Sequence, residues 1–264
     1  MAADLAGKCA LVTGASSGLG VDFARELAAR GARLVIVARR DELLKLVQEE
    51  IKNRYGVEVM TVALDLGAPS APQELYDLLR QQNVQVDVLV NNAGFGLFGM
   101  ELDIPWERTR DMLQLDIVAL THLTKLFARD MVKRGSGWLL QVASIGAYQP
   151  SPTYAAYSAA KSYVLSFSDA LNLELRGTGV SCTALSPGYT ETAFLEVSGQ
   201  KPTLFHQLTA MKPAEVARIG VQRMLDRGYS VVPGWINKLL AFSTRLTPRP
   251  LLAWLTWRLM RNPS

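Results

Sequence analysis

Histidine and cysteine are scarce in this chain of 264 residues, which contains two of each. The histidines, His122 and His206, lie far apart and no CxxC pair is present, so the sequence offers no recognisable set of metal ligands. Cys9 and Cys182 each lie in a short apolar run, which predicts buried thiols rather than a disulfide. We therefore expect no metal site.

Long hydrophobic runs and a strong excess of charge are also missing. No apolar run reaches the roughly 18 to 20 residues that span a bilayer, and residues 1–8 lack the pattern of a secretory signal. The 28 basic and 24 acidic residues leave a net charge of +4, too small an excess to indicate nucleic-acid binding. We expect a cytoplasmic protein without a nucleic-acid partner.

Short apolar, β-branched runs alternate with longer amphipathic stretches, a pattern typical of a parallel sheet covered by helices. The runs predict seven strands, at residues 9–13, 33–38, 58–64, 86–91, 137–143, 180–186 and 230–233. The stretches between them predict six helices, at about 18–30, 41–54, 70–82, 105–134, 153–177 and 213–227. The fold class is therefore α/β: a doubly wound (Rossmann) seven-stranded parallel sheet with helices on both faces, a three-layer sandwich.

No polar linker divides this alternating pattern, so residues 1–234 are expected to form one domain that binds a dinucleotide and carries the catalytic site. Within it, residues 186–212 are interrupted by glycine and proline, and a loop of that length is usually a lid or a binding segment. Residues 235–264 follow as a separate tail.

A glycine-rich segment follows the first predicted strand and opens the first helix, with glycines at Gly14, Gly18 and Gly20. Its spacing differs from the GxGxxG pattern of many dinucleotide sites. Glycine nevertheless lets the backbone approach a pyrophosphate closely, and the N–H groups at a helix start face the anion. The residues expected to bind the cofactor here are Gly14, Ser16, Ser17, Gly18, Leu19 and Gly20.

Arg39 ends the second predicted strand, where an NAD-selective site would place an acidic residue against the ribose 2′-hydroxyl. A guanidinium at this place suits a 2′-phosphate. The alternative is that Arg39 is only a solvated surface charge. The sequence thus favours NADP(H), with NAD(H) as the alternative cofactor.

Tyr157 and Lys161 lie four residues apart in the fifth predicted helix, so they project from one face of it. A tyrosine with its usual pKa near 10 is a poor proton carrier at neutral pH, but a neighbouring ammonium favours the phenolate. Ser144, at the end of the fifth strand, can donate a hydrogen bond to a carbonyl or alkoxide oxygen. These three residues are candidates for catalysis.

With the glycine-rich segment and Asn91-Asn92-Ala93-Gly94, these residues resemble the short-chain dehydrogenase/reductase family in order and spacing, from about Leu5 to Gly234. The resemblance implies that Tyr157 gives its proton to a carbonyl oxygen while nicotinamide delivers hydride, and that Lys161 also binds the nicotinamide ribose. It further implies cofactor contacts at Asp65, Leu66, Asn92, Ala93, Gly94, Tyr157, Lys161, Pro187, Gly188, Thr190 and Thr192.

Asp116 departs from the family, which commonly has asparagine in the middle of this helix to support a water chain that reaches the lysine. An aspartate there would pair with Lys161 and raise the pKa of the lysine. We include Asp116 among the catalytic residues and expect activity to survive with a changed pH profile, because a carboxylate can still accept a hydrogen bond from the water. The alternative is a sharp fall in activity.

The residues expected to line the substrate side are largely apolar: Phe95, Leu97, Phe98, Ile145, Tyr148 and Tyr154. We therefore expect an NADP(H)-dependent oxidoreductase that interconverts a hydrophobic ketone or aldehyde and its alcohol. A homodimer or homotetramer is expected. The rival interpretation is a regulatory or scaffold protein that binds NADP(H) but has lost efficient chemistry.

Residues 235–264 hold three of the five tryptophans and carry basic residues at intervals. The pattern predicts an amphipathic helical tail, interrupted by proline, that packs on the domain, covers the substrate cleft or contacts another subunit. The alternative is weak contact with a membrane surface, in a peripheral membrane enzyme acting on lipid-like substrates.

Overall fold

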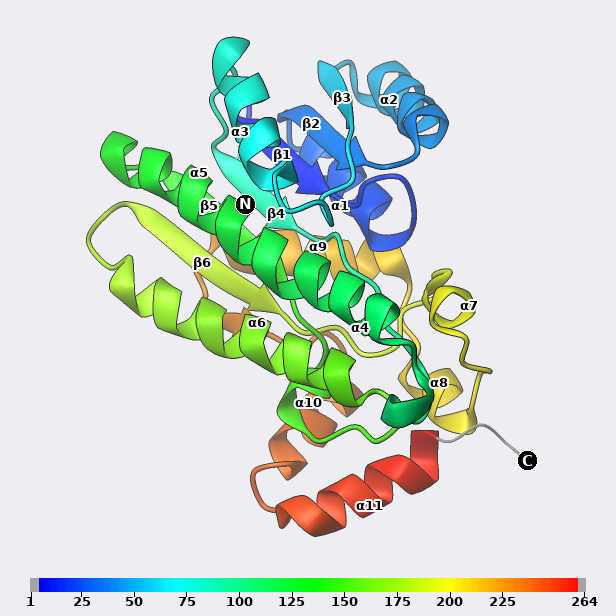
Figure 1. The fold of residues 1–264 in the computed structure, drawn as a ribbon. Helices are drawn as coiled ribbons and strands as arrows, with labels where there is room; N and C mark the ends of the chain where they lie inside the picture. Colours follow the sequence, from blue (N-terminus) through cyan, green and yellow to red (C-terminus); the bar gives the residue numbers. More distant parts are fainter. Residues whose placement is uncertain (1–4, 261–264) are drawn as a thin grey trace.

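The computed structural model describes residues 5–260, apart from the side chains of residues 204, 205 and 208. Seven parallel strands form one sheet in the order β3-β2-β1-β4-β5-β6-β7 (Figure 1). The strands are β1 (Cys9–Thr13), β2 (Arg33–Ala38), β3 (Val59–Ala63), β4 (Val88–Asn91), β5 (Gly137–Val142), β6 (Val180–Leu185) and β7 (Ser230–Val231). Each strand lies within its predicted range, and the predicted fold is confirmed.

Helices cover both faces of the sheet. One core forms where α1 (Gly18–Ala29), α2 (Asp41–Tyr55) and α9 (Pro213–Leu225) pack on one face, and it includes the fully buried Phe23 and Leu44. The opposite core lies under α3 (Ala71–Gln81) and α5 (Leu120–Arg134), while α6 (Ala155–Glu174) packs beside them against β6. The result is a sheet between two helical layers.

The stretch predicted as one helix over 105–134 has three parts. Helix α4 (Trp106–Leu113) leads into a π-helical segment, η2 (Gln114–Ala119), which continues into α5. No glycine or proline lies within this segment. A π-helical turn is frequent at functional sites, and this one carries Asp116.

Two short helices lie in the segment predicted to be irregular, α7 (Phe194–Ser198) and α8 (Leu204–Thr209). Two 3-10 turns, η1 (Glu101–Asp103) and η3 (Ile145–Tyr148), follow β4 and β5. The segments that follow the strands therefore contain short helices at the carboxyl edge of the sheet.

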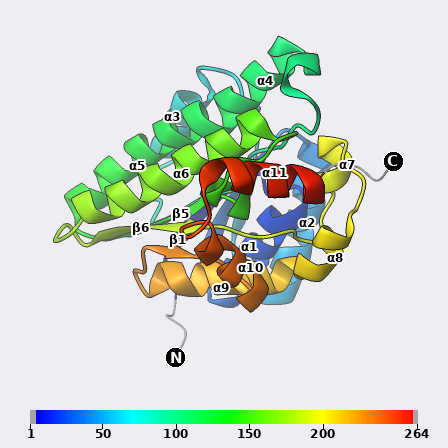
Figure 2. The ribbon, with the colours of Figure 1, turned by 90° about the horizontal axis from the view of Figure 1, so that it is seen from below.

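The tail forms two further helices, α10 (Trp235–Ser243) and α11 (Arg249–Met260). Figure 2, which views the molecule from below, shows both in front, and Figures 1 and 2 agree in placing the end of α11 near α8. Buried Asn237 anchors α10 by donating hydrogen bonds to the carbonyls of Pro233 and Thr209. Within residues 5–260, no helix is both long enough and apolar enough to cross a bilayer.

Candidate active site

A cavity of about 390 Å³ opens at the carboxyl edge of the sheet. In a doubly wound sheet, ligands bind there because the chain crosses to opposite faces from the two central strands and leaves a crevice. Here those strands are β1 and β4. Most of the predicted site residues line this single cavity: Gly14, Ser16, Ser17, Gly18, Leu19, Arg39, Asp65, Leu66, Asn92, Ala93, Gly94, Ser144, Tyr157, Lys161, Pro187, Gly188, Thr190 and Thr192.

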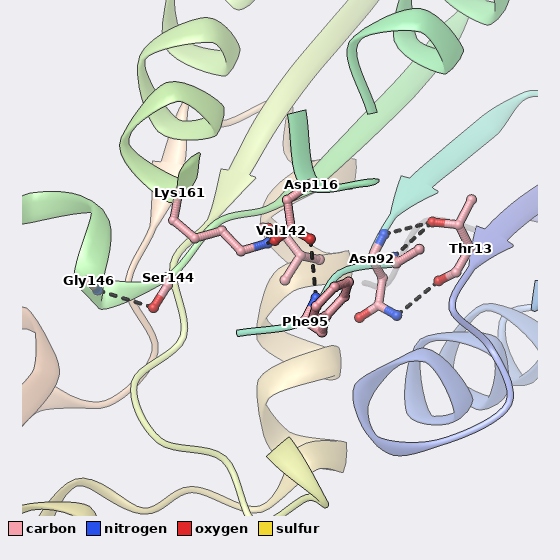
Figure 3. A network of polar contacts seen from close by, with 9 residues as sticks. Thr13, Asn92, Phe95, Asp116, Val142, Ser144, Gly146 and Lys161 are labelled. Carbon is pink, nitrogen blue, oxygen red and sulfur yellow. Dashed lines mark hydrogen bonds and ion pairs between the residues drawn. The ribbon is translucent and has the colours of Figure 1, made fainter. Parts of the chain in front are cut away.

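The ends of β1 and β4 are joined by polar contacts between Thr13 and Asn92 (Figure 3). The Thr13 hydroxyl oxygen accepts hydrogen bonds from the N–H groups of Asn92 and Ala93, both at 3.0 Å, and the Asn92 amide donates to the Thr13 carbonyl at 2.9 Å. Gly14 turns away from them with φ of +68°, and a Cβ there would lie 2.9 Å from the Ala93 Cα. Only glycine fits this turn.

Helix α1 begins at Gly18, and Ser17 precedes it without capping it through its side chain. Instead, the Ser16 and Ser17 hydroxyls accept hydrogen bonds from the Arg40 guanidinium at 3.1 Å and 3.0 Å. The first turn of α1 therefore keeps N–H groups for an anion in the cavity, and a guanidinium is held beside them.

Arg39 and Arg40 both line the cavity, although the sequence analysis named only Arg39. The Arg39 side chain is 75% exposed and lies 3.9 Å from the Asp65 carboxylate. Arg40 is fixed by the two serines, so it is the better placed of the two for a phosphate. The sequence signal that could have identified Arg40 is its position next to Arg39.

Gly20 and Asp116 are the two predicted site residues that do not line the cavity. Gly20 is buried, and a Cβ there would collide with the Gly14 carbonyl, so it permits the turn rather than touching a ligand. Asp116 is fully buried behind Lys161.

Lys161 points from α6 toward the end of β5 and toward the π-helical segment (Figure 3). Its ammonium donates a hydrogen bond to the Val142 carbonyl at 3.2 Å and lies 2.9 Å from the Asp116 carboxylate. The same nitrogen lies 5.6 Å from the centroid of the Tyr157 ring. The Lys161 ammonium therefore acts on Tyr157 by its electric field, while the Asp116 carboxylate holds the lysine in place.

The Asp116 carboxylate also accepts a hydrogen bond from the Phe95 N–H at 3.1 Å. Gly94 leaves the room for this contact, because a Cβ there would lie 2.8 Å from the nearer carboxylate oxygen. Asp116 thus connects the loop after β4 to Lys161, with which it pairs as predicted.

The Ser144 hydroxyl oxygen accepts a hydrogen bond from the Gly146 N–H at 3.1 Å (Figure 3). Because this contact uses a lone pair of the Ser144 oxygen, the hydroxyl proton stays free to point toward a ligand in the cavity. Ser144 is therefore arranged to donate.

Electrostatics at the site keep Tyr157 protonated at neutral pH. Burial raises the pKa of the Tyr157 phenol; the Lys161 ammonium lowers it, the Asp116 carboxylate raises it, and the Ser144 hydroxyl lowers it. Burial by itself would lower the pKa of Lys161, but Asp116 and Tyr157 outweigh it and raise that pKa. The site holds an ammonium beside a phenol that can donate a proton.

The far end of the cavity is apolar with a buried polar wall. Tyr154 and Phe194 lie beside the Tyr157 ring, at 5.7 Å and 5.6 Å between centroids. The Tyr154 hydroxyl donates to the Gln200 side-chain oxygen at 2.9 Å, and the Gln200 amide donates to the Met260 carbonyl at 2.7 Å. The end of α11 therefore forms part of the cavity wall.

Of the substrate-side residues expected from sequence, Phe95, Ile145 and Tyr154 line the cavity, whereas Leu97, Phe98 and Tyr148 do not reach it. Sequence reasoning missed several lining residues that come from the segment 186–212 and the tail: Phe194, Val197, Gln200, His206 and Met260. No motif marks them. Within the described part of the chain, His, Cys, Asp and Glu side chains form no group of three that could hold a metal ion.

Comparison with known proteins gives a consistent result. Residues 8–203 match the model of a protein family described as short chain dehydrogenase. The very-long-chain 3-oxoacyl-CoA reductase of Anas platyrhynchos is 32% identical over 248 residues, which cover 90% of this chain and 77% of that relative. The likeness therefore extends over most of both proteins.

Solved structures share the same architecture. A short-chain dehydrogenase from Sphingobium yanoikuyae in complex with NADPH matches with a TM-score of 0.81 at 28% identity, over 90% of this chain and 93% of that one. A 7β-hydroxysteroid dehydrogenase matches with a TM-score of 0.86 at 25% identity, over 94% of this chain and 96% of that one.

Proposed function

The chain belongs to the short-chain dehydrogenase/reductase family, and on this premise we propose that it reduces a hydrophobic ketone to an alcohol with NADPH. The family establishes an NAD(P)-dependent oxidoreductase acting on CH–OH groups. The observation that carries the finer proposal is the position of Tyr157, which stands in the cavity between the lysine and an apolar substrate side.

The cavity fits a phosphorylated dinucleotide at its other end. The tight turn at Gly14 and the uncapped start of α1 suit a pyrophosphate, and the Arg39 and Arg40 guanidinium groups suit a 2′-phosphate. The segment from Pro187 to Thr192 lines the side where the nicotinamide would lie. NADPH, when bound, supplies hydride to the carbonyl carbon.

Side chains of this protein bind and protonate the carbonyl oxygen of the substrate. Ser144 donates a hydrogen bond to the carbonyl oxygen and so stabilises the negative charge that develops there. Tyr157 transfers its phenolic proton to the same oxygen, and the Lys161 ammonium stabilises the phenolate that is left. Because Lys161 is held by Asp116 and the Val142 carbonyl, its charge stays in place during the transfer.

The lining on the substrate side selects for apolar groups. Phe95, Ile145, Phe194 and Val197 line the cavity together with Tyr157. The relatives named as very-long-chain 3-oxoacyl-CoA reductases and the 7β-hydroxysteroid dehydrogenase are named for apolar substrates with a ketone or the matching alcohol. We propose long-chain 3-oxoacyl thioesters as the first substrate class to test.

Replacing Tyr157 by phenylalanine tests the proposal directly. Tyr157→Phe keeps the ring contacts with Tyr154 and Phe194 but removes the proton, so we expect turnover of a ketone to fall about 10²- to 10⁴-fold. NADPH oxidation and NADPH binding by fluorescence are the measurements, and binding is expected to change little.

The matched control is Tyr163→Phe, on the same helix, where the tyrosine is 38% exposed and its hydroxyl lies 3.0 Å from the Thr121 hydroxyl. This variant should turn over like the native enzyme. Native-like turnover by Tyr157→Phe would remove Tyr157 from the mechanism.

A second candidate is an NADP(H)-binding protein without efficient turnover, and the Asp116 carboxylate on Lys161 is the observation that favours it. The carboxylate neutralises part of the charge that should assist Tyr157. This candidate predicts that native protein and Asp116→Asn are both inert across a panel of carbonyl compounds, although both bind NADPH. Turnover by the native protein excludes it.

A further inference from the structure

Helix α11 is apolar on both of its sides. Leu252 and Thr256 face the protein and are buried, with 8% and 4% of their surface exposed. The other side carries five large apolar residues that are each 39–51% exposed: Leu251, Trp254, Leu255, Trp257 and Leu259. A helix with large apolar side chains on both sides is normally covered on both sides, so the outer side of α11 requires a partner.

Helix α10 and the connection to α11 extend this surface. Trp235, Leu239, Phe242 and Leu246 are 56–76% exposed, and Figure 2 shows both helices on the same side of the molecule. Among the side chains that the structure describes, half of the 18 exposed large apolar ones lie in residues 235–260. We call these nine residues the tail face. Exposed apolar surface gathered in this way marks an interaction site.

The charged side chains within residues 235–260 are all positive. Residues 235–260 contain Lys238, Arg245, Arg249 and Arg258, each exposed, and no aspartate or glutamate. The Arg258 guanidinium lies 5.2 Å from the centroid of the Trp254 ring. Tryptophan beside arginine on an apolar helix is the composition of segments that rest in the boundary of an anionic bilayer. Two copies of this surface would instead bring like charges together.

The tail face is connected to the substrate side of the cavity. Met260, in the last turn of α11, lines the cavity, and its carbonyl accepts a hydrogen bond from buried Gln200. We propose that the tail face docks on the surface of an anionic membrane and that the apolar substrate passes from the bilayer into the cavity beside Met260. The substrate route rests on the proposed function, whereas the docking does not.

Sedimentation with lipid vesicles tests the docking on the full chain. Vesicles of phosphatidylcholine alone are compared with vesicles that also contain phosphatidylglycerol. We expect binding to the anionic vesicles, weaker binding to the neutral ones, and release as salt is raised. Native protein that stays in the supernatant with both kinds of vesicle would overturn the proposal.

The double variant Trp254→Glu with Trp257→Glu places two negative charges on the tail face. Its partition onto anionic vesicles should fall roughly tenfold or more. The matched control is Trp106→Glu on α4, because Trp106 is 63% exposed and lies outside the tail. Equal vesicle binding by the double variant and the control would contradict the assignment.

Three further measurements separate membrane docking from misfolding of the variant, from self-association and from turnover. Quenching of native tryptophan fluorescence by brominated lipids should occur with the anionic vesicles, and a lack of quenching in bound protein would contradict insertion of the tail face. Sedimentation velocity gives the subunit number: a dimer that the double variant dissociates, without vesicle binding, would assign the face to a second copy. NADPH oxidation with a water-soluble ketone tests the proposed function separately from docking.

Discussion

Asp116 decides how strongly Lys161 acts on Tyr157. The carboxylate lies 2.9 Å from the ammonium and is fully buried, so its field is little screened by water. It raises the pKa of Tyr157, against the lowering by Lys161. A protonated phenol suits carbonyl reduction, in which the tyrosine donates, better than alcohol oxidation, in which it must accept.

Asp116→Asn should therefore change the pH dependence of both directions. Removing the carboxylate lowers the pKa of Tyr157. Since reduction needs the phenol and oxidation the phenolate, the decline of kcat/KM for reduction at alkaline pH should move to lower pH, and the rise for oxidation should move the same way. The matched control is Asp111→Asn, because Asp111 is exposed and pairs with Arg110. Profiles of Asp116→Asn that superimpose on the native ones would contradict the coupling.

At the scale of single residues, the sequence predicted which side chains meet in the cavity, because Ser144, Tyr157 and Lys161 occupy fixed positions on or beside regular elements. Ser144 follows β5, and Tyr157 and Lys161 share one side of α6. The choice between Arg39 and Arg40 was not predictable, because it depends on two serine hydroxyls that come from the distant loop after β1.

Among the elements, β4, β5 and α5 are joined by buried polar side chains. The Asn91 amide donates to the side-chain oxygens of Gln141 and Thr124, both at 3.0 Å, and the Gln141 amide donates to the Thr124 hydroxyl at 2.9 Å. All three residues are 3% exposed or less. These contacts fix the strand that ends at the Asn92 loop against the helix that follows the π-helical segment.

Gln141→Met should lower the free energy of unfolding by about 2 kcal/mol, because it leaves the Asn91 amide and the Thr124 hydroxyl each with one partner fewer in the core. Urea unfolding followed by tryptophan fluorescence measures the change. Gln73→Met is the control: Gln73 is exposed and contacts Asp77 on the same helix, so a change within about 0.5 kcal/mol is expected. A urea midpoint of Gln141→Met equal to that of the native protein would show that these hydrogen bonds contribute little to the free energy of unfolding.

The elements that the sequence predicted least well are those whose shape depends on tertiary contacts. The π-helical segment at 114–119 has the composition of an ordinary helix, and its distinguishing contact is the inward Asp116. The short helices α7 and α8 have five and six residues, too few to show a helical period. The strands were predictable because burial on both faces makes them continuously apolar.

For the whole molecule, the cofactor side of the cavity is assembled from both halves of the sheet, so it exists only in the folded chain. NADPH at 100 times its dissociation constant should therefore raise the free energy of unfolding by about 2.7 kcal/mol. Thermal unfolding with and without the cofactor is the measurement.

The same measurement tests the role of Arg40. At an equal concentration of NADPH, Arg40→Ala should show a smaller stabilisation, while the effect of NADH should stay unchanged because NADH lacks the 2′-phosphate. Arg54→Ala, at the other end of α2, serves as the control and should behave as the native chain. If Arg40→Ala reduced the stabilisation by NADPH and by NADH equally, Arg40 would not bind the 2′-phosphate.

The hydrogen bond from Gln200 to the Met260 carbonyl has an evolutionary consequence. One residue inserted within α11 would turn that carbonyl by about 100° and shift it by about 1.5 Å, away from the glutamine. Lineages that keep the same substrate are therefore expected to change α11 by point replacement, and to gain or lose residues only in the stretch 244–248 that precedes it.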